Sequence, residues 1–294
     1  MKKYLFFVFL ILLLASGCGN NKELPENTEI PVPAETPAEA SPTAEATAEP
    51  VKTAEPTLVP ATKTPETKAP ESVPDKEVNV KSEKTGGLSG KVICIDAGHG
   101  KTEKTGKEKI APDSEETKAK HVSGADGSVY SEEEINLMVA KKLRDKLQAL
   151  GVEVIMTREG HNCDYSNIDR AEIANNAGAD LMIRIHADSA ESSSAKGMTM
   201  LLPSSEHISD KELIRVSRNI GEKVLDSAAE ATGAKNRGCV ERPDMTGFNW
   251  SEVPVILLEM GFLSNPDEDA SLSEDSYQNK IVQGIVSGLQ DYYG

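Results

Sequence analysis

Residues 92–100 read Val92-Ile93-Cys94-Ile95-Asp96-Ala97-Gly98-His99-Gly100, and the fold can be worked out from this stretch. Its first four residues are an apolar run, which is typical of a short strand buried within a sheet. Glycines and a histidine follow almost at once, so we expect the strand to end there, with the histidine just beyond it.

The chain that follows alternates between apolar runs of this kind and segments with helical periodicity. In residues 135–150, for example, apolar side chains recur at helical spacing until Gly151 stops the helix. We expect strands at 92–95, 152–157, 181–185, 198–202 and 255–258, and helices at 135–150, 168–177, 211–231 and 276–292. Such alternation predicts an α/β fold: a single, largely parallel, twisted sheet with helices on both faces.

Residues suited to metal chemistry lie at the ends of three of these strands. His99, His186 and Glu259 each follow directly after an apolar run, and Glu132 stands at the start of the first helix. In open α/β sheets, sites gather outside the carboxyl ends of the strands, so we expect these side chains to converge. Two imidazoles and a carboxylate are suitable zinc ligands that leave a position for water.

Each of these residues also has a purely structural interpretation. A histidine at a strand end is often simply hydrogen-bonded. The carboxylates of residues 132–134 would suit the positive end of a helix macrodipole, and Glu259 could belong to an ion pair. Spacing alone therefore leaves both interpretations open.

Five short motifs, in order along the chain, add a family resemblance. They are Ile95-Asp96-Ala97-Gly98-His99-Gly100, Glu132-Glu133-Glu134-Ile135-Asn136-Leu137, Ile185-His186-Ala187-Asp188, Asn236-Arg237-Gly238 and Leu258-Glu259-Met260-Gly261-Phe262-Leu263-Ser264-Asn265. Together they resemble the zinc-dependent N-acetylmuramoyl-L-alanine amidases called the Amidase_3 family. The resemblance covers residues 91–293.

The resemblance implies that His99, Glu132 and His186 bind zinc and that Glu259 is the catalytic carboxylate. It implies a peptidoglycan hydrolase that cleaves the amide bond between N-acetylmuramic acid and the L-alanine of the stem peptide. Glu259 would act as general base and then general acid toward a zinc-activated water.

The chain departs from the family pattern at three positions near these residues. Ala97 stands where proline is usual, Arg184 where serine is usual and Asp188 where asparagine is usual. None of these changes removes a ligand, but the last two flank the second histidine. At the triple glutamate, Glu133 and Glu134 are the alternative ligands.

Two functions of other kinds compete with an amidase. One is a catalytically silent cell-wall-binding module, which a missing ligand would have favoured. The other is a different zinc peptidase that acts within the stem peptide. The loop of residues 237–254 is a candidate for substrate contact through Phe248 and Trp250, although both aromatic residues could equally pack in the core. We expect residues 101–130 to form a mobile polar loop that leaves the metal site open.

The first residues of the chain resemble a lipoprotein signal. Residues 4–15 are an unbroken apolar run behind Lys2 and Lys3, too short for a membrane-spanning helix, which needs about 20 apolar residues. The run ends Leu14-Ala15-Ser16-Gly17-Cys18, similar to a bacterial lipobox. We therefore expect residues 1–18 to be a signal peptide and Cys18 to carry the lipid anchor. The alternative is an N-terminal anchor that is never cut.

Residues 19–89 contain eleven of the chain's 16 prolines and no Phe, Trp or Tyr. This composition predicts a disordered, extended linker ahead of a catalytic domain at 90–294. The net charge of −16 argues against nucleic acid as a partner. The expected partners are peptidoglycan and, through the lipid, the outside of the cell membrane, with the protein as a monomer facing the cell wall.

Three further cysteines lie in the expected domain. Cys94 falls in an apolar run and is expected to be a small core residue. Cys163 and Cys239 could form a bridge, which the sequence does not decide.

Overall fold

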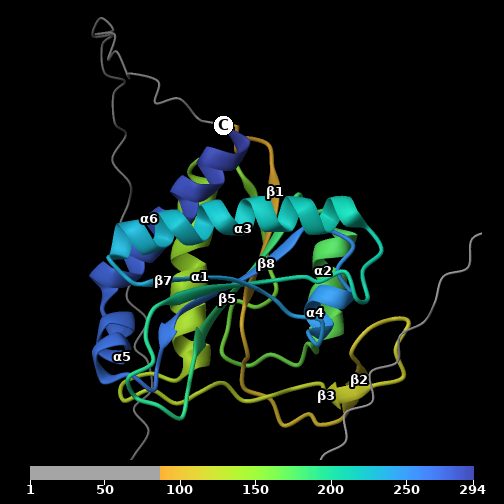
Figure 1. Cartoon of the computed structure of the whole chain (residues 1–294), viewed down its shortest axis with the longest axis horizontal. Coiled ribbons are helices and arrows are strands. Elements are labelled where there is room, and N and C mark those ends of the chain that lie inside the picture. The colour runs from red at the N-terminus through yellow and green to blue at the C-terminus, as the bar shows by residue number, and fades with distance from the viewer. Residues whose placement is uncertain (1–86) are drawn as a thin grey trace, which may run out of the picture. The chain divides into compact units, whose positions relative to one another are not determined.

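The computed structural model describes residues 87–294, which form a six-stranded sheet with helices on both sides (Figure 1). The strand order across the sheet is β4-β1-β5-β8-β6-β7. The strands are β1 (Val92–Ala97), β4 (Glu153–Met156), β5 (Leu181–Asp188), β6 (Met198–Leu202), β7 (Asn236–Glu241) and β8 (Val255–Phe262). Strands β4, β1, β5 and β8 run parallel, β6 is antiparallel to β8, and β7 is parallel to β6. The predicted largely parallel sheet is confirmed.

Helices cover the two faces of the sheet unequally. The helices are α1 (Glu132–Gln148), α2 (Asn167–Asn176), α3 (Lys211–Thr232), α4 (Thr246–Asn249), α5 (Pro266–Ser273) and α6 (Asp275–Tyr293). Successive side chains of a strand point to opposite faces, and in β1 Ile93 and Ile95 join the larger hydrophobic cluster, with α1, α3 and α6. Cys94 points the other way, into a smaller cluster with Ala174 of α2 and Phe248 of α4.

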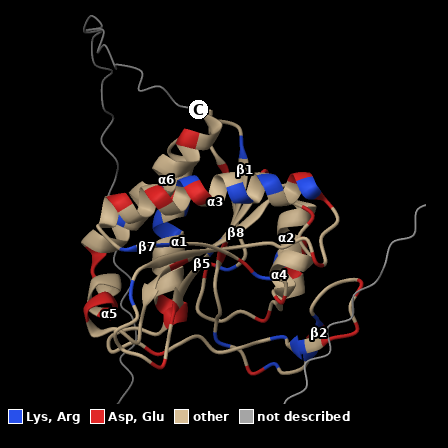
Figure 2. Cartoon of the chain, in the orientation of Figure 1, with Lys and Arg blue, Asp and Glu red and all other residues tan. Residues whose placement is uncertain are grey.

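Helices α3 and α6 pack directly on each other because glycines let their backbones approach closely. A Cβ atom added at Gly284 would lie 2.4 Å from the Cα of Ala228, and one at Gly288 would lie 2.6 Å from the Cα of Val224. The outward side of α3 carries charged residues of both signs (Figure 2), so this helix is amphipathic.

Part of the expected loop at residues 101–130 is in fact a hairpin, formed by β2 (Lys107–Lys109) and antiparallel β3 (Thr117–Ala119). Distant residues anchor it. Trp250 Nε1 donates a hydrogen bond to the carbonyl oxygen of Lys109 (3.2 Å), and Asn249 Nδ2 donates to that of Ile110 (3.0 Å). The expectation of an irregular loop is therefore wrong for this segment, because the hairpin depends on contacts far away in the sequence.

Strands β5 and β8 extend further than the apolar runs suggested. They reach Asp188 and Phe262, so His186 and Glu259 lie inside the strands, near their carboxyl ends, rather than beyond them. Strand β7 was not expected either. It is a polar edge strand within the segment that had been assigned to a loop.

The predicted signal peptide, Cys18 and most of the predicted linker lie outside the described residues. The described part begins at Gly87, and Leu88 is already fully buried in the larger cluster. Within residues 87–294, no helix has both the length and the apolar character needed to cross a membrane.

Candidate metal centre

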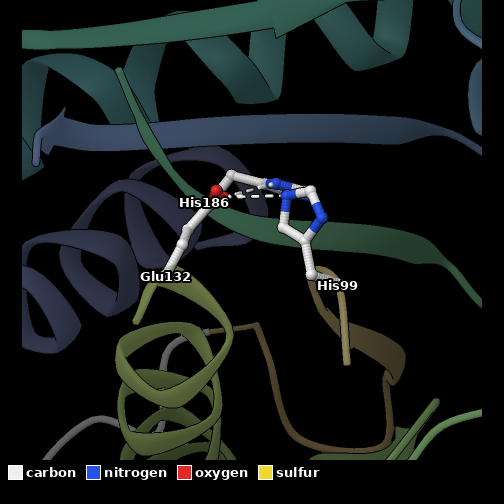
Figure 3. Close-up of side chains that lie close together, drawn as sticks. All are labelled: His99, Glu132 and His186. Carbon is white, nitrogen blue, oxygen red and sulfur yellow. Dashed lines mark hydrogen bonds and ion pairs between the residues drawn. The ribbon is translucent and has the colours of Figure 1, made fainter. Parts of the chain in front are cut away.

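Three side chains that are distant in the sequence meet at the carboxyl ends of β1 and β5 (Figure 3). His99 follows β1, His186 lies near the end of β5, and Glu132 is the first residue of α1. Glu132 Oε1 lies 3.0 Å from His99 Nε2 and 3.0 Å from His186 Nδ1. The three donor atoms lie within 4.8 Å of one another, a spacing compatible with one ion about 2 Å from each.

The backbone at His99 turns the imidazole toward His186. Its φ of 60° is in the left-handed region, which costs a non-glycine residue of order 1–3 kcal/mol and persists only where its surroundings impose it. Arg170 Nη2 donates to the carbonyl oxygen of His99 (2.6 Å), and the amide of Gly98 donates to that of Ile185 (3.0 Å). The two imidazole rings lie edge to face, with centroids 4.8 Å apart.

Hydrogen bonding fixes which nitrogen of His99 is available to a metal. His99 Nδ1 lies 2.8 Å from the carbonyl oxygen of Val122. Because a carbonyl only accepts, Nδ1 must carry the proton, and in the neutral ring Nε2 is then unprotonated. Nε2 is the atom that faces Glu132.

Close packing holds the second histidine in place. A Cβ atom at Gly98 would lie 2.3 Å from the His186 ring, so only glycine lets β1 approach it this closely. Burial lowers the pKa of His186 to about 4, despite the neighbouring Glu132. The ring is therefore neutral near pH 7, as a metal-binding imidazole must be.

Glu132 is oriented by neutral donors as well as by the histidines. Its Oε2 accepts a hydrogen bond from the amide of Ala125 (2.9 Å), and its Oε1 accepts from the amide of Ala187 (3.2 Å) and from Asn136 Nδ2 (3.3 Å). Burial alone would raise the pKa of Glu132, but its close contacts with His186 and His99 hold that pKa well below its ordinary value. The carboxylate is thus ionised and aimed at the two rings.

The other two glutamates of the triple lie elsewhere. Glu133 lies near His161 (3.2 Å to Nδ1), Lys101 Nζ (3.3 Å) and Arg158 Nη1 (3.6 Å). Glu134 caps the start of α1, so the capping interpretation applies to it. The structure therefore brings Glu132, and neither alternative, to His99 and His186.

Glu259 stands beside the three-residue group without joining it. It is paired directly with His186 across β5 and β8, so the two side chains project from the same face of the sheet. Its Oε2 is buried and has no hydrogen-bond partner among residues 87–294. Burial, together with Glu132 and Asp188, raises the pKa of Glu259 well above its ordinary value. An unpaired carboxylate next to the group is suited to accept a proton.

A buried ionic cluster lies under the site, and sequence reasoning did not identify it. Asp96 is fully buried. It accepts hydrogen bonds from Thr157 Oγ1 (2.6 Å), Arg170 Nη1 (2.6 Å) and Arg184 Nε (2.8 Å). Burial alone would raise the pKa of Asp96, but the two guanidiniums hold it well below its ordinary value. Since Arg170 also binds the carbonyl of His99, this cluster positions the first histidine. The sequence did hold a sign of this cluster: Asp96 and Arg184 are charged residues that adjoin or interrupt apolar runs.

Residues 101–130 reach the group through their backbone. The carbonyl of Val122 and the amide of Ala125 contact His99 and Glu132 respectively. No side chain from this stretch belongs to the three-residue group.

The aromatic residues of the 237–254 segment serve the scaffold. Phe248 is fully buried in the smaller hydrophobic cluster, so its core interpretation is correct. Trp250 is partly buried and binds the hairpin through Lys109.

The three described cysteines are free thiols. Cys94 is a core residue, as expected. Cys163 is buried with its Sγ 3.1 Å from Arg170 Nη2, while Cys239 lies on β7. The bridge that the sequence left open is not formed.

Two imidazole nitrogens and one carboxylate oxygen are a donor set that suits zinc or a similar divalent ion. Burial keeps His186 neutral and Glu132 is ionised, as metal ligands must be. Burial lowers the pKa of His99, but contact with Glu132 raises it overall, so His99 would release its Nε2 proton when a metal binds. The fold and the site thus define an α/β protein with a candidate metal centre of the two-histidine, one-carboxylate kind.

Residues 93–291 match the family described as N-acetylmuramoyl-L-alanine amidase, Amidase_3. The chain belongs to this family. It is 28% identical over 204 residues to the N-acetylmuramoyl-L-alanine amidase LytC of Bacillus subtilis, a match that covers 69% of this chain but only 36% of LytC. The chain therefore spans about a third of the length of that relative.

Solved structures show the same fold. The catalytic domain of CwlV, an N-acetylmuramoyl-L-alanine amidase from Bacillus (Paenibacillus) polymyxa var. colistinus, matches with a TM-score of 0.56 at 29% identity, covering 69% of this chain and 97% of that one. The amidase Ami1 of Mycobacterium smegmatis matches with a TM-score of 0.64 at 23% identity, covering 70% and 98%.

Proposed function

We propose that this chain is a zinc-dependent N-acetylmuramoyl-L-alanine amidase that cleaves the bond between N-acetylmuramic acid and the L-alanine of the stem peptide. The observation that carries the proposal is the meeting of His99, Glu132 and His186 next to the unpaired carboxylate of Glu259. Membership of the amidase family supports the choice of bond.

In this proposal different residues of the chain bind the metal, transfer the proton and position the site. His99, Glu132 and His186 hold zinc, which when bound supplies a Lewis acid that lowers the pKa of water and polarises an amide carbonyl. Glu259 takes a proton from the attacking water and returns it to the leaving amine nitrogen of L-alanine. Arg170 keeps the His99 turn in place from beneath the site.

Mass spectrometry of purified cell wall digested with the protein tests this function. An amidase releases intact stem peptides that begin with a free L-alanine amino group and leaves the glycan strands uncut. Peptide fragments cut within the stem would instead indicate a zinc peptidase. The absence of any release, with wall binding retained, would indicate a silent binding module.

Replacing His186 by alanine is expected to abolish zinc binding. The wild-type chain should contain about one zinc ion per molecule, and the variant close to none, because only two of the three donors are left. Metal analysis of the purified full-length chains, after removal of loosely bound ions, measures this. His207, which lies near Asp113 and outside the group, provides the control, and His207→Ala should keep its zinc. Equal zinc content in His186→Ala and wild type would refute the ligand assignment.

We also propose the arrangement of the whole chain: a lipoprotein signal at 1–18, a disordered linker at 19–89 and the zinc amidase domain at 90–294. The lipid on Cys18 would hold the protein at the outside of the membrane, and the linker would let a monomeric domain reach the peptidoglycan. The sequence patterns of these segments support this arrangement.

Replacing Cys18 by alanine is expected to release the protein from the membrane fraction without loss of its hydrolytic activity. The reason is that the acyl chains, and not the domain, provide the attachment. Cell fractionation together with incorporation of a labelled fatty acid measures both effects. Cys239→Ala, which alters a free thiol in the described domain, should leave fractionation and labelling unchanged. Full membrane retention of Cys18→Ala would support an uncut N-terminal anchor.

A further inference from the structure

A pocket of about 200 Å³ opens beside His99 and His186. Four basic residues line it, and none of its lining residues is acidic. The basic residues are Lys118, Lys120, Arg170 and Arg184. In a chain with a net charge of −16, such a local excess of positive charge favours an anionic ligand. The hairpin at β2 carries several lysines, drawn blue in Figure 2, and Lys118 of β3 lines the pocket.

Arg184, which lines this pocket, has one guanidinium nitrogen that is not used in hydrogen bonds. Its side chain is almost fully buried, with Nε bound to Asp96 (2.8 Å) and Nη2 bound to Asn167 Oδ1 (2.9 Å). Its Nη1 makes no hydrogen bond to any of residues 87–294 and lies against Gly247, where a Cβ atom would come within 2.3 Å of it. Gly247 therefore makes room for the guanidinium, and Nη1 keeps N–H groups with which it can donate to a ligand.

The charges beneath the pocket do not balance. The single carboxylate of Asp96 lies between two guanidiniums, those of Arg170 and Arg184, so one positive charge is left over. Lys118 adds a second, since its Nζ donates only to a backbone carbonyl (2.7 Å). Two carboxylates act on Lys118. Asp244 is paired with Arg242, and Glu108, opposite Lys118 in the hairpin, offsets one positive charge, so one positive charge remains in this group.

We propose that this pocket binds the free α-carboxylate of the residue that follows L-alanine in the stem peptide, and that Arg184 and Lys118 select stem peptides in which this group is not amidated. This inference rests on the proposed amidase function and deepens it. It assigns Arg184, at a position where the family usually has serine, to substrate choice.

The spacing of the pocket from the metal centre matches the substrate. Arg184 and His186 project from the same face of β5, two residues apart, which is about 6.6 Å along a strand. In the stem peptide, the scissile carbonyl and the α-carboxylate of the residue after L-alanine are also two residues apart, a span of at most about 7 Å in an extended chain. A substrate that lies along β5 with its scissile carbonyl at the metal centre would therefore bring that carboxylate close to Arg184.

Two muramyl dipeptides of equal length test the proposal, one ending in D-glutamate with a free α-carboxylate and the other in D-isoglutamine. Wild type should cleave the first with a kcat/KM about 10- to 100-fold higher, the range expected for a hydrogen bond to a charged group. Arg184→Ser should bring this ratio to within about threefold, because the charge-assisted bond is lost. Lys118→Ala should lower the ratio partway.

Matched variants keep the result interpretable. Lys109→Ala removes the same charge from the same hairpin but outside the pocket, and should leave the ratio unchanged. If Arg184→Ser fails to fold because Asp96 loses a partner, Lys118→Ala still carries the test. Equal cleavage of both substrates by wild type would overturn the inference and leave the amidase function standing.

Calorimetry separates a failure of the proposed function from a failure of this inference. The purified chain is titrated with L-alanyl-D-glutamate, L-alanyl-D-isoglutamine and inorganic phosphate. If wild type cleaves neither muramyl dipeptide nor cell wall, the proposed function fails. The binding data alone then show whether the pocket binds the α-carboxylate. Preference for the glutamate dipeptide supports the inference. Equal binding of the two dipeptides, or phosphate binding as tightly as the acid, would overturn it.

Discussion

Replacing Glu259 by glutamine is expected to lower the rate of stem-peptide release by about 10²–10⁴-fold, the usual contribution of a positioned general acid–base group. Glutamine has the same shape but cannot take a proton from water. The zinc content should not change, because Glu259 stands beside the three-residue group and is not part of it. Release of stem peptides from purified wall and metal analysis of the same samples measure the two quantities.

The matched control for this prediction is Glu252→Gln. Glu252 is exposed and lies just before the strand that carries Glu259, so its replacement should leave both the rate and the zinc content at wild-type values. Nearly full activity in Glu259→Gln would place the proton-transfer role on another residue.

Replacing Asp96 by asparagine is expected to lower the free energy of unfolding by about 3–5 kcal/mol, the cost typical of breaking a buried ion pair. The substitution leaves the guanidiniums of Arg170 and Arg184 buried without their counter-charge. Chemical denaturation followed by circular dichroism measures the change. Asp291→Asn, which alters an exposed aspartate of α6, should shift the same quantity by less than about 0.5 kcal/mol.

The effect of Asp96 should depend on pH in a defined direction. Its pKa in the folded protein lies below the ordinary value of 3.8, so folding favours the ionised form. The stabilisation is fully present above about pH 4 and is lost as the pH falls further. The difference in unfolding free energy between wild type and Asp96→Asn should therefore shrink below pH 4. A constant difference down to pH 2 would contradict the ion-pair explanation.

Hydrophobic periodicity sufficed to predict the main elements of the sheet. The central strands β1, β5 and β8 are apolar because both of their faces are buried. In the long helices, the apolar residues that pack against the sheet recur every three or four positions. Strand β7 and the hairpin escaped prediction for the opposite reason. Their sequences, such as Lys107-Glu108-Lys109, are polar, because these strands lie at an edge or away from the core and are held by backbone pairing and distant contacts.

The residues that meet at the candidate metal centre could be proposed from strand ends and motif order, but their setting could not. The left-handed backbone of His99 and its protonated Nδ1 depend on contacts with Arg170 and Val122, which lie 71 and 23 residues away in the sequence. The pairing of Asp96 with Arg184 likewise requires the register between two strands. Local sequence patterns carry no information on such long-range pairings.

The uneven packing of the two sheet faces has a consequence for laboratory evolution of this protein. Most of the apolar packing, including the contact between α3 and α6, lies on the face away from Glu259 and Arg184. Random libraries restricted to the interior positions of α3 and α6 should thus yield thermotolerant clones that keep the parental substrate range. Libraries in the β2–β3 hairpin alter the wall of the basic pocket, and from these we expect clones with changed substrate range and reduced heat tolerance.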